Sequence, residues 1–249
     1  MHPALISSAV LPLLTAAVVA VLLAMGEAPE AARYAAVLPL AYLIGAMPWG
    51  YMVLYWRRGV DIRQYGSGRI GMSNVLRTAG GKIAVLVLAL DLGKGVLSVL
   101  LVREVIGPAT AEVAAGLLAL IGHNWPVFLK FRGGRGIATG LGGLFVMAPI
   151  PAAIGAICFV PITLLSRYLS LGSITGVIAA CLSLVALTLL GQYSTLSLLG
   201  LTLVGQYSTT YSVYAFLGGA IIIWQHRDNI QRILQGTERR LGSPAGKAG

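Results

Sequence analysis

Long apolar runs, separated by short polar clusters rich in glycine and arginine, most restrict how this chain can fold. The first run extends from about Leu5 to Met25, and the second from about Tyr34 to Trp56. Because a helix rises about 1.5 Å per residue, about 20 apolar residues cross the roughly 30 Å hydrocarbon core of a membrane. The pattern therefore predicts an all-α, polytopic membrane protein.

The composition supports this class and restricts the function. Hydrophobic residues make up 57% of the 249 and charged residues only 10%, and no polar stretch is long enough for a separate soluble domain. In a soluble chain the net charge of +10 would suggest nucleic acid. Here it fits cytoplasmic loops rich in Lys and Arg together with an anionic substrate or lipid surface. We expect membrane lipids as partners and no nucleic acid.

The two cysteines, Cys158 and Cys181, lie in apolar runs, and we expect no disulfide between them.

The first apolar run has two interpretations. A secretory signal is one, but no Lys or Arg precedes Leu5, and the run is longer than the apolar core of a normal signal. We therefore favour a retained transmembrane helix.

A third span, Ile83 to Val102, contains Asp91 and Lys94. At a spacing of three residues they share one helix face and can neutralise each other, and ionisable groups at this depth point into the helix bundle. A structural ion pair and a role in a site both remain open.

The remaining spans follow from the same pattern. A fourth apolar stretch reaches about Gly122, and a further span reaches about Leu190. Between them, Pro149 and Pro151 are expected to divide an apolar run into two short helices, 137–148 and 152–165. The string LTLLGQYST at Leu187 recurs as LTLVGQYST at Leu201, which indicates a local duplication. The last span ends near Trp224 and leaves a polar, basic tail, 225–249.

The positions of the cations predict the topology. Most of the 18 Lys and Arg lie in the segments 57–82, 130–135, 167 and 227–247, whereas Arg33 and Arg103 belong to the opposite face. The face rich in cations is the cytoplasmic one. Eight crossings with both termini inside follow if the duplication adds none. Four polar clusters then meet on one cytoplasmic surface.

The first polar cluster, from Gly66 to Arg77, has the composition of an anion site. Glycine lets backbone N–H groups approach a ligand, and the arginine fork suits phosphate oxygens. The spacing is neither that of a P-loop nor that of a dinucleotide-binding fold. An ordinary cytoplasmic loop is the alternative. The candidate ligand-binding residues are Gly66, Ser67, Gly68, Gly71, Ser73, Asn74 and Arg77.

The second cluster, Gly122 to Gly136, repeats this logic. Two arginines flank Gly133 and Gly134 immediately before a helix expected from Ile137. Free N–H groups and the macrodipole at a helix N-terminus favour anions. A turn that touches lipid head groups is the alternative.

Two of the three histidines lie in polar clusters. His123 and His226 each have a structural and a site interpretation: a hydrogen-bonded helix end or a group that contacts substrate. The sequence has no HExxH motif or cysteine cluster for a metal and no GxSxG nucleophile motif. We expect neither a metal nor a cofactor.

Five strings together resemble one family, that of the bacterial acyl-phosphate-dependent glycerol-3-phosphate acyltransferases, the PlsY family. The likeness covers about residues 38 to 240, with the motifs in the same order. The strings are AYLIGAMPWGY (41–51), GVDIRQYGSGRIGMSNVLR (59–77), GHNWPVFLKFRGGRGIAT (122–139), SLGSIT (170–175) and HRDNIQRILQGTE (226–238).

This resemblance implies an enzyme that moves a fatty acyl group from acyl phosphate to the 1-hydroxyl of glycerol 3-phosphate, giving lysophosphatidic acid and phosphate. It implies a seven-helix core at 34–240, an extra N-terminal helix and link at 1–33, and a flexible tail at 241–249. The implied catalytic residues are Ser67, Arg77, Arg135, Ser173, His226 and Asn229. The substrate-binding residues are Gly66, Gly68, Gly71, Ser73, Asn74, His123, Gly133 and Gly134.

Three features depart from the family pattern. The family usually has Asn, Ala and Thr at the positions of Arg69, Met72 and Ser73. It usually has Lys at the position of Arg135. Its members typically start near residue 35 of this chain and have no second copy of the repeat.

The expected partners are glycerol 3-phosphate, acyl phosphate, membrane lipids and the soluble enzyme that makes acyl phosphate. The alternative functions are a transporter of phosphorylated anions or phospholipid, for which Asp91 and Lys94 would matter, and a binder of lipid head groups.

Overall fold

The computed structural model describes residues 1–192, 207–243 and 246, and every regular element among them is a helix. Five of these helices are long and apolar enough to cross a membrane, or six if one bent pair counts as a single span. The predicted all-α membrane fold is thus confirmed, while eight crossings remain a prediction. The chain divides into two compact units, Met1–Gly143 with Leu241–Gly249, and Leu144–Arg240.

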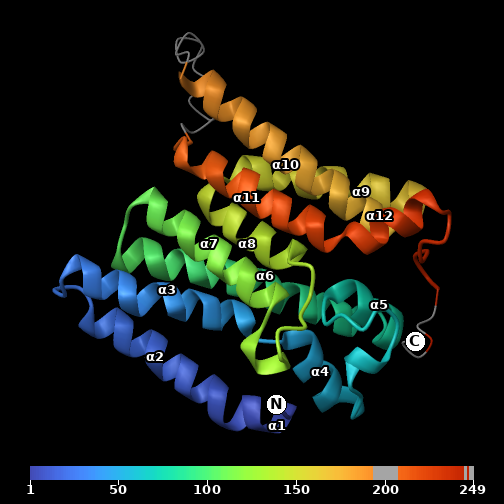
Figure 1. The fold of residues 1–249 in the computed structure, drawn as a ribbon, viewed down its shortest axis with the longest axis horizontal. Helices are drawn as coiled ribbons and strands as arrows, with labels where there is room; N and C mark the ends of the chain where they lie inside the picture. Colours follow the sequence, from blue (N-terminus) through green and yellow to red (C-terminus); the bar gives the residue numbers. More distant parts are fainter. Residues whose placement is uncertain (193–206, 244–245, 247–249) are drawn as a thin grey trace. The chain divides into compact units, whose positions relative to one another are not determined.

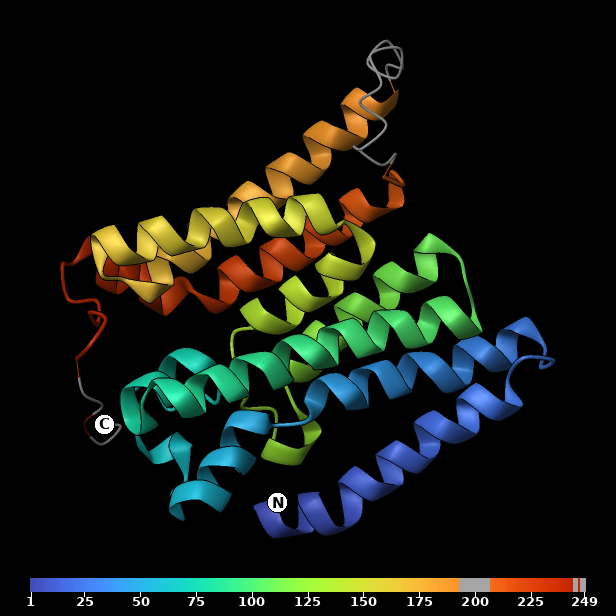
Figure 2. The same cartoon turned by 180° about the vertical axis from the view of Figure 1, so that it is seen from behind.

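The first unit begins with a continuous helical segment, which corresponds to the predicted first span. This segment comprises α1 (Pro3–Leu5), the π-helical turn η1 (Ile6–Val10) and α2 (Leu11–Ala24). It packs against α3 (Glu30–Ala46), and the blue ribbons of Figure 1 run side by side. In both ribbon views the N-terminus lies beside α4 (Trp49–Arg58) (Figure 2).

The second predicted span is wrong in one respect. We expected one helix from Tyr34 to Trp56, but the chain breaks at Met47 and Pro48, and α3 and α4 meet at a bend of 40°. Proline has no N–H to continue the helical ladder and disfavours helical backbone in the residue before it. The break lets the carbonyl of Met47 accept a hydrogen bond from Lys94 at 3.0 Å.

The rest of the unit is built from longer helices and the two glycine loops. The helices α6 (Gly81–Val105) and α7 (Ala109–Asn124) both pack against α3. The remaining elements are η2 (Ile62–Gln64), α5 (Met72–Ala79), η3 (Val127–Leu129) and α8 (Ile137–Met147).

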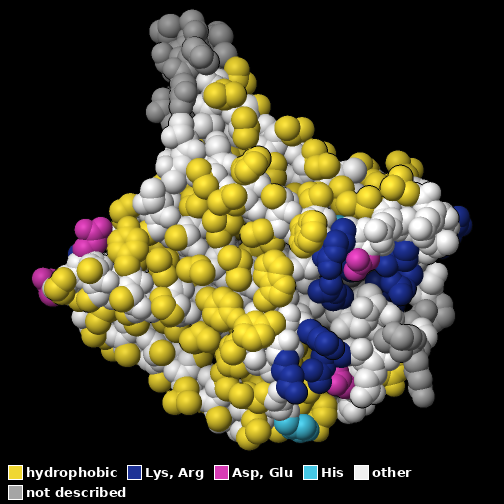
Figure 3. Space-filling view, viewed as in Figure 1, with side chains coloured by type: hydrophobic (Ala, Val, Ile, Leu, Met, Phe, Trp, Pro, Cys, Tyr) yellow, Lys and Arg dark blue, Asp and Glu magenta, His cyan; other side chains and the backbone are white. Residues whose placement is uncertain are grey.

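Polar side chains mark the two ends of this unit. At one end Arg33 donates to the Val105 carbonyl at 3.1 Å, and Arg103 pairs with Glu112 at 2.7 Å. Arg33 and Arg103 therefore lie at the same end, as the distribution of charge predicted. Figure 3 shows hydrophobic side chains over α2, α3 and α7, whereas Lys and Arg side chains gather beside α4.

The second unit contains α9 (Pro149–Ser166), α10 (Leu169–Gln192), α11 (Thr210–Gln225) and α12 (Arg227–Leu234). The apolar run divides into two helices at these prolines, as predicted: α8 ends at Met147, and α9 begins at Pro149, three residues before the expected start at 152. Pro149 and Pro151 lie within the first turn of α9 and not before it, because proline loses no helical hydrogen bond there. The string SLGSIT (170–175) lies in the first turns of α10, and the predicted polar tail contains α12. Most of the duplicated segment, 193–206, lies outside the described residues, as do 244–245 and 247–249 of the expected flexible tail.

Candidate functional site

The first glycine loop, Gly66–Gly71, is folded around a buried asparagine. Gly66 and Gly68 have φ values of 57° and 66°, a left-handed conformation that side chains disfavour. The Asn74 side chain is 1% exposed, and its Nδ2 donates to the carbonyls of Tyr65 and Arg69, both at 2.9 Å. Its Oδ1 accepts the Ser67 N–H at 3.1 Å. Asn74 thus holds the loop, while its contact with a ligand stays a prediction.

Ser67 carries the hydroxyl that this loop presents. Its Oγ is shielded from solvent and has no hydrogen-bond partner within the described part of the chain. A buried hydroxyl without a partner costs free energy, so such a group marks a place where a ligand or water completes the hydrogen bonding. Ser73 and Arg77 are half-buried on α5, one helical turn apart on a common face.

An ion pair fixes the approach to the loop. Arg63 donates from Nε to Oδ1 of Asp61 at 2.9 Å and from Nη2 to Oδ2 at 2.7 Å. The Arg63 guanidinium also lies 4.6 Å from the centre of the Tyr51 ring. Burial alone would raise the pKa of the Asp61 carboxyl, but the hydrogen bonds and charge of Arg63 outweigh burial, so this pKa lies below its ordinary value.

The second glycine loop folds back onto the end of α7. The N–H of Gly133 donates to the Asn124 carbonyl at 3.1 Å, and the N–H of Gly134 donates to the His123 carbonyl at 3.0 Å. A Cβ at Gly134 would overlap the His123 ring, and a Cβ at Gly133 would overlap the His123 carbonyl. The two glycines therefore have a packing role: only a backbone without side chains comes this close.

His123 belongs to a buried ionic cluster. Asp91 and Lys94 pair at 3.1 Å, and His123 Nδ1 lies 3.6 Å from Asp91 Oδ1. The three side chains are 2%, 4% and 3% exposed. The predicted ion pair of Asp91 with Lys94 is thus confirmed, and the cluster contacts the glycine loop through His123. A role of Asp91 or Lys94 in a site stays a prediction.

A second unsatisfied group lies beside this loop. Asn124 is fully buried, and neither its Oδ1 nor its Nδ2 has a hydrogen-bond partner in the described ranges. Its amide faces Gly136, which has a φ of 84° and directly precedes α8. Arg135, half-buried, stands between Gly134 and this helix start. Backbone N–H groups at the start of a helix attract anions, so the loop has the local features of an anion site.

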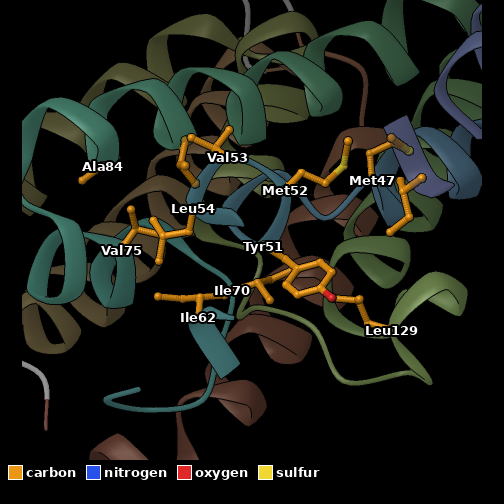
Figure 4. Close-up of a cluster of buried hydrophobic side chains, with 12 residues drawn as sticks. Met47, Tyr51, Met52, Val53, Leu54, Ile62, Ile70, Val75, Ala84 and Leu129 are labelled. Carbon is orange, nitrogen blue, oxygen red and sulfur yellow. The ribbon is translucent and has the colours of Figure 1, made fainter. Parts of the chain in front are cut away.

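The two glycine loops share one hydrophobic base. Leu129, four residues before Gly133, is buried in the same cluster as Ile62, which precedes the first loop, and Ile70, which lies in it. Tyr51 of α4 belongs to this cluster too. Figure 4 shows these four side chains converging from separate segments. The structure therefore brings together the first two predicted polar clusters at one end of the first unit.

The other predicted site residues lie in the second unit. His226 is buried between α11 and α12, and its Nδ1 lies 2.8 Å from the Ile222 carbonyl. A carbonyl only accepts, so Nδ1 donates this hydrogen bond. Ser173 lies in the second turn of α10, and its hydroxyl donates to the Leu169 carbonyl at 2.8 Å.

Glu238 is a central residue of the second unit that the sequence did not single out. It is 8% exposed, and its Oε1 accepts from Asn229 at 2.8 Å and from Ser170 at 2.9 Å, while its Oε2 accepts from Arg232 at 2.8 Å. An acidic residue in a tail that is otherwise mostly basic was the available signal. Glu238 orients Asn229, whose Oδ1 is buried with no partner among the residues described.

Comparison with known proteins identifies the family. The sequence matches the family described as Glycerol-3-phosphate acyltransferase over residues 35–236. It is 44% identical over 222 residues to Glycerol-3-phosphate acyltransferase 3 of Dehalococcoides mccartyi, covering 84% of this chain and 96% of the relative. The chain belongs to the glycerol-3-phosphate acyltransferase family.

Further matches agree with this membership. The Glycerol-3-phosphate acyltransferase of Thermoanaerobacter sp. is 40% identical, over 82% of this chain and 93% of the relative. The crystal structure of PlsY (YgiH), an integral membrane glycerol 3-phosphate acyltransferase, in its glycerol 3-phosphate form superposes with a TM-score of 0.71 at 36% identity. This match covers 84% of this chain and 96% of PlsY. The lysophosphatidic acid form of PlsY gives a TM-score of 0.70 at 34% identity.

The candidate site residues of this acyltransferase lie within the part of the chain that matches the family. Ser67, Arg77, Arg135, Ser173 and the His226–Asn229 segment all fall within residues 35–236. The helical segment α1 to α2 precedes the matched region, and Glu238 follows it by two residues.

Proposed function

We propose that this protein is an acyl-phosphate:glycerol-3-phosphate O-acyltransferase, which makes lysophosphatidic acid and inorganic phosphate. Family membership over residues 35–236 is the observation that carries this proposal. It is supported by the glycerol 3-phosphate and lysophosphatidic acid forms in which a related protein has been solved. The donor, acyl phosphate, is the finer part of the proposal.

Both proposed substrates carry phosphate, and the two glycine loops are suited to it. The first loop contains Ser67 and is followed on α5 by Arg77, whereas the second contains Arg135 and lies beside Asn124. Ser67 Oγ and the Asn124 amide are buried and lack a hydrogen-bond partner in the described residues. Backbone donors and guanidinium forks together neutralise phosphate without a metal ion. We assign Arg77 and Arg135 to phosphate oxygens and Ser67 to a hydrogen bond with substrate.

The proposed reaction is a direct displacement. The 1-hydroxyl oxygen of glycerol 3-phosphate attacks the acyl carbonyl carbon, the bond from that carbon to the phosphate oxygen breaks, and phosphate leaves with its electron pair. No acyl-enzyme forms. Because phosphate is already a good leaving group, positioning and stabilisation of developing negative charge supply most of the catalysis.

His226 and Asn229 are assigned to the reacting hydroxyl. Nδ1 of His226 donates to the Ile222 carbonyl, and we assign the other ring nitrogen, Nε2, to accept a hydrogen bond from the 1-hydroxyl. The proton leaves to this nitrogen, to an oxygen of the donor phosphate or to water. Ser173 completes the proposed set.

The proposed setting is the bacterial plasma membrane, with the site facing the cytoplasm because the cations predict that face. The acyltransferase domain spans 34–240, with the added helix and link at 1–33 and a tail at 241–249. The soluble enzyme that makes acyl phosphate is the proposed supplier of the donor.

A reconstituted assay tests the proposal. Purified protein in lipid, given acyl phosphate and glycerol 3-phosphate, should release phosphate and form lysophosphatidic acid in equal amounts, whereas acyl-CoA should give no product. Turnover with acyl-CoA alone would contradict the assigned donor. Flux of glycerol 3-phosphate into sealed vesicles without chemical conversion would instead support a transporter.

A further inference from the structure

The first helical segment of the chain, α1 to α2, is tied to the core beneath the two glycine loops. Ile6 is 0% exposed and belongs to the same buried cluster as Ile62, Ile70 and Leu129. These last three residues flank or lie within the glycine loops. A side chain that precedes the family-matched region at residue 35 therefore forms part of the hydrophobic base of the site.

One stripe of this segment faces the protein over its whole length. Positions three, four or seven residues apart fall on one side of a helix. The stripe consists of Ile6, Val10, Leu14, Val18, Val21 and Met25, all buried or half-buried against the two hydrophobic clusters of the first unit. The outward side chains Leu5, Leu13 and Leu23 are 57%, 70% and 82% exposed, as expected for residues that face lipid.

The contacts near the N-terminus reach α4 itself. α1 packs against α4, and the rings of His2 and Tyr55 meet edge to face with their centres 4.9 Å apart. Tyr55 is one helical turn beyond Tyr51, whose ring packs under Arg63. The N-terminal end of this segment thus packs directly against α4.

We propose that the segment α1 to α2 is a positioning element of the substrate-binding site: through Ile6 it fixes the hydrophobic base on which both glycine loops rest. The inference rests on the proposed role of these loops in phosphate binding. Interiors are closely packed, so removing a fully buried side chain lets its neighbours shift into the space. Leu129 lies only four residues before Gly133, and Ile70 only two after Gly68, so such a shift displaces the loop backbone.

The test compares substitutions at two adjacent aliphatic residues, the buried Ile6 and the exposed Leu5, in the 249-residue protein. Ile6→Ala should raise KM for glycerol 3-phosphate on the order of tenfold while kcat changes about twofold or less, because loop position governs binding of the substrate. Leu5→Ala, at an exposed neighbour, is the matched control and should leave both constants unchanged. Ile6→Leu, which conserves volume, should restore KM.

The outcomes separate this inference from the proposed function. If the wild-type protein converts the substrates and Ile6→Ala has a normal KM despite a lowered melting temperature, the segment is only a stabilising addition and the inference is overturned. If the wild-type protein makes no lysophosphatidic acid, the proposed function fails instead. Should Ile6→Ala not fold, Ile6→Val takes its place, with a smaller rise in KM supporting the inference and none refuting it.

Discussion

The Nδ1 atom of His123 lies 3.6 Å from Oδ1 of Asp91, and both side chains are almost completely buried. Lys94 completes this cluster with an Nζ that contacts Asp91 at 3.1 Å and the Met47 carbonyl at 3.0 Å. The cluster links the break between α3 and α4 to the glycine loop that covers His123. Its integrity should therefore affect both stability and substrate binding.

Replacing Asp91 by Asn should lower the stability of the protein by about 3 to 5 kcal/mol, because Lys94 then keeps an uncompensated charge in the interior. Thermal unfolding in detergent measures this. Glu104→Gln, at an exposed position, is the control. The double variant Asp91→Asn/Lys94→Met should recover part of the loss, and a double variant less stable than Asp91→Asn would contradict this account.

Gly134→Ala should raise KM for glycerol 3-phosphate by about tenfold or more, since the new Cβ would overlap the His123 ring and push the loop away. Steady-state kinetics at varied glycerol 3-phosphate measures the effect. Gly93→Ala adds the same methyl group on α6, where nothing lies within 4 Å, and should behave as wild type. Equal KM values for the two variants would show that the contact with His123 does not position the loop.

Ser67→Ala should lower kcat/KM on the order of a hundredfold with little change in melting temperature. The substitution removes the buried hydroxyl but keeps the N–H that donates to Asn74, so the loop stays folded. Ser8→Ala, at an exposed position on the first helical segment, is the control. Normal turnover of Ser67→Ala would remove Ser67 from the proposed site.

Glu238→Gln should destabilise the second unit by about 1.5 to 3 kcal/mol, because an amide replaces the carboxylate that accepts from Arg232, Asn229 and Ser170. Chemical unfolding monitored by near-UV circular dichroism measures this. Asp228→Asn alters an acid on α12 whose side chain is 45% exposed, and should have a small effect. Equal effects of the two variants would argue against Glu238 as the centre of this network.

The ion pair of Asp61 with Arg63 predicts a dependence of stability on pH. The pKa of Asp61 is lowered in the folded protein, so its carboxylate stabilises the fold above the unfolded pKa, and this contribution is lost as the pH falls through the folded pKa. Melting temperatures of wild type and Asp61→Asn should therefore differ at pH 7 and converge below about pH 4. A difference that stays constant from pH 7 to pH 3 would exclude this ion pair as its source.

The sequence by itself determined the membrane class, the position of most helices, and the two glycine loops with their arginines. These follow from local properties: run length sets a membrane span, and glycine and arginine composition sets the chemistry of a loop. The same reasoning located Ser67, His123 and His226, and it paired Asp91 with Lys94 from their spacing alone. Local patterns did not reveal the bend at Met47 or that α10 already begins at Leu169.

Only the tertiary structure decided what these residues contact. It turned Asn74 into the support of the first loop and Gly134 into a close-packing position against His123, and it made Glu238 the partner of Asn229. It also buried Ile6, which the sequence shows only as one apolar residue in a long apolar run. Such roles depend on which distant segments meet, and a one-dimensional pattern of hydrophobicity carries no information on those contacts.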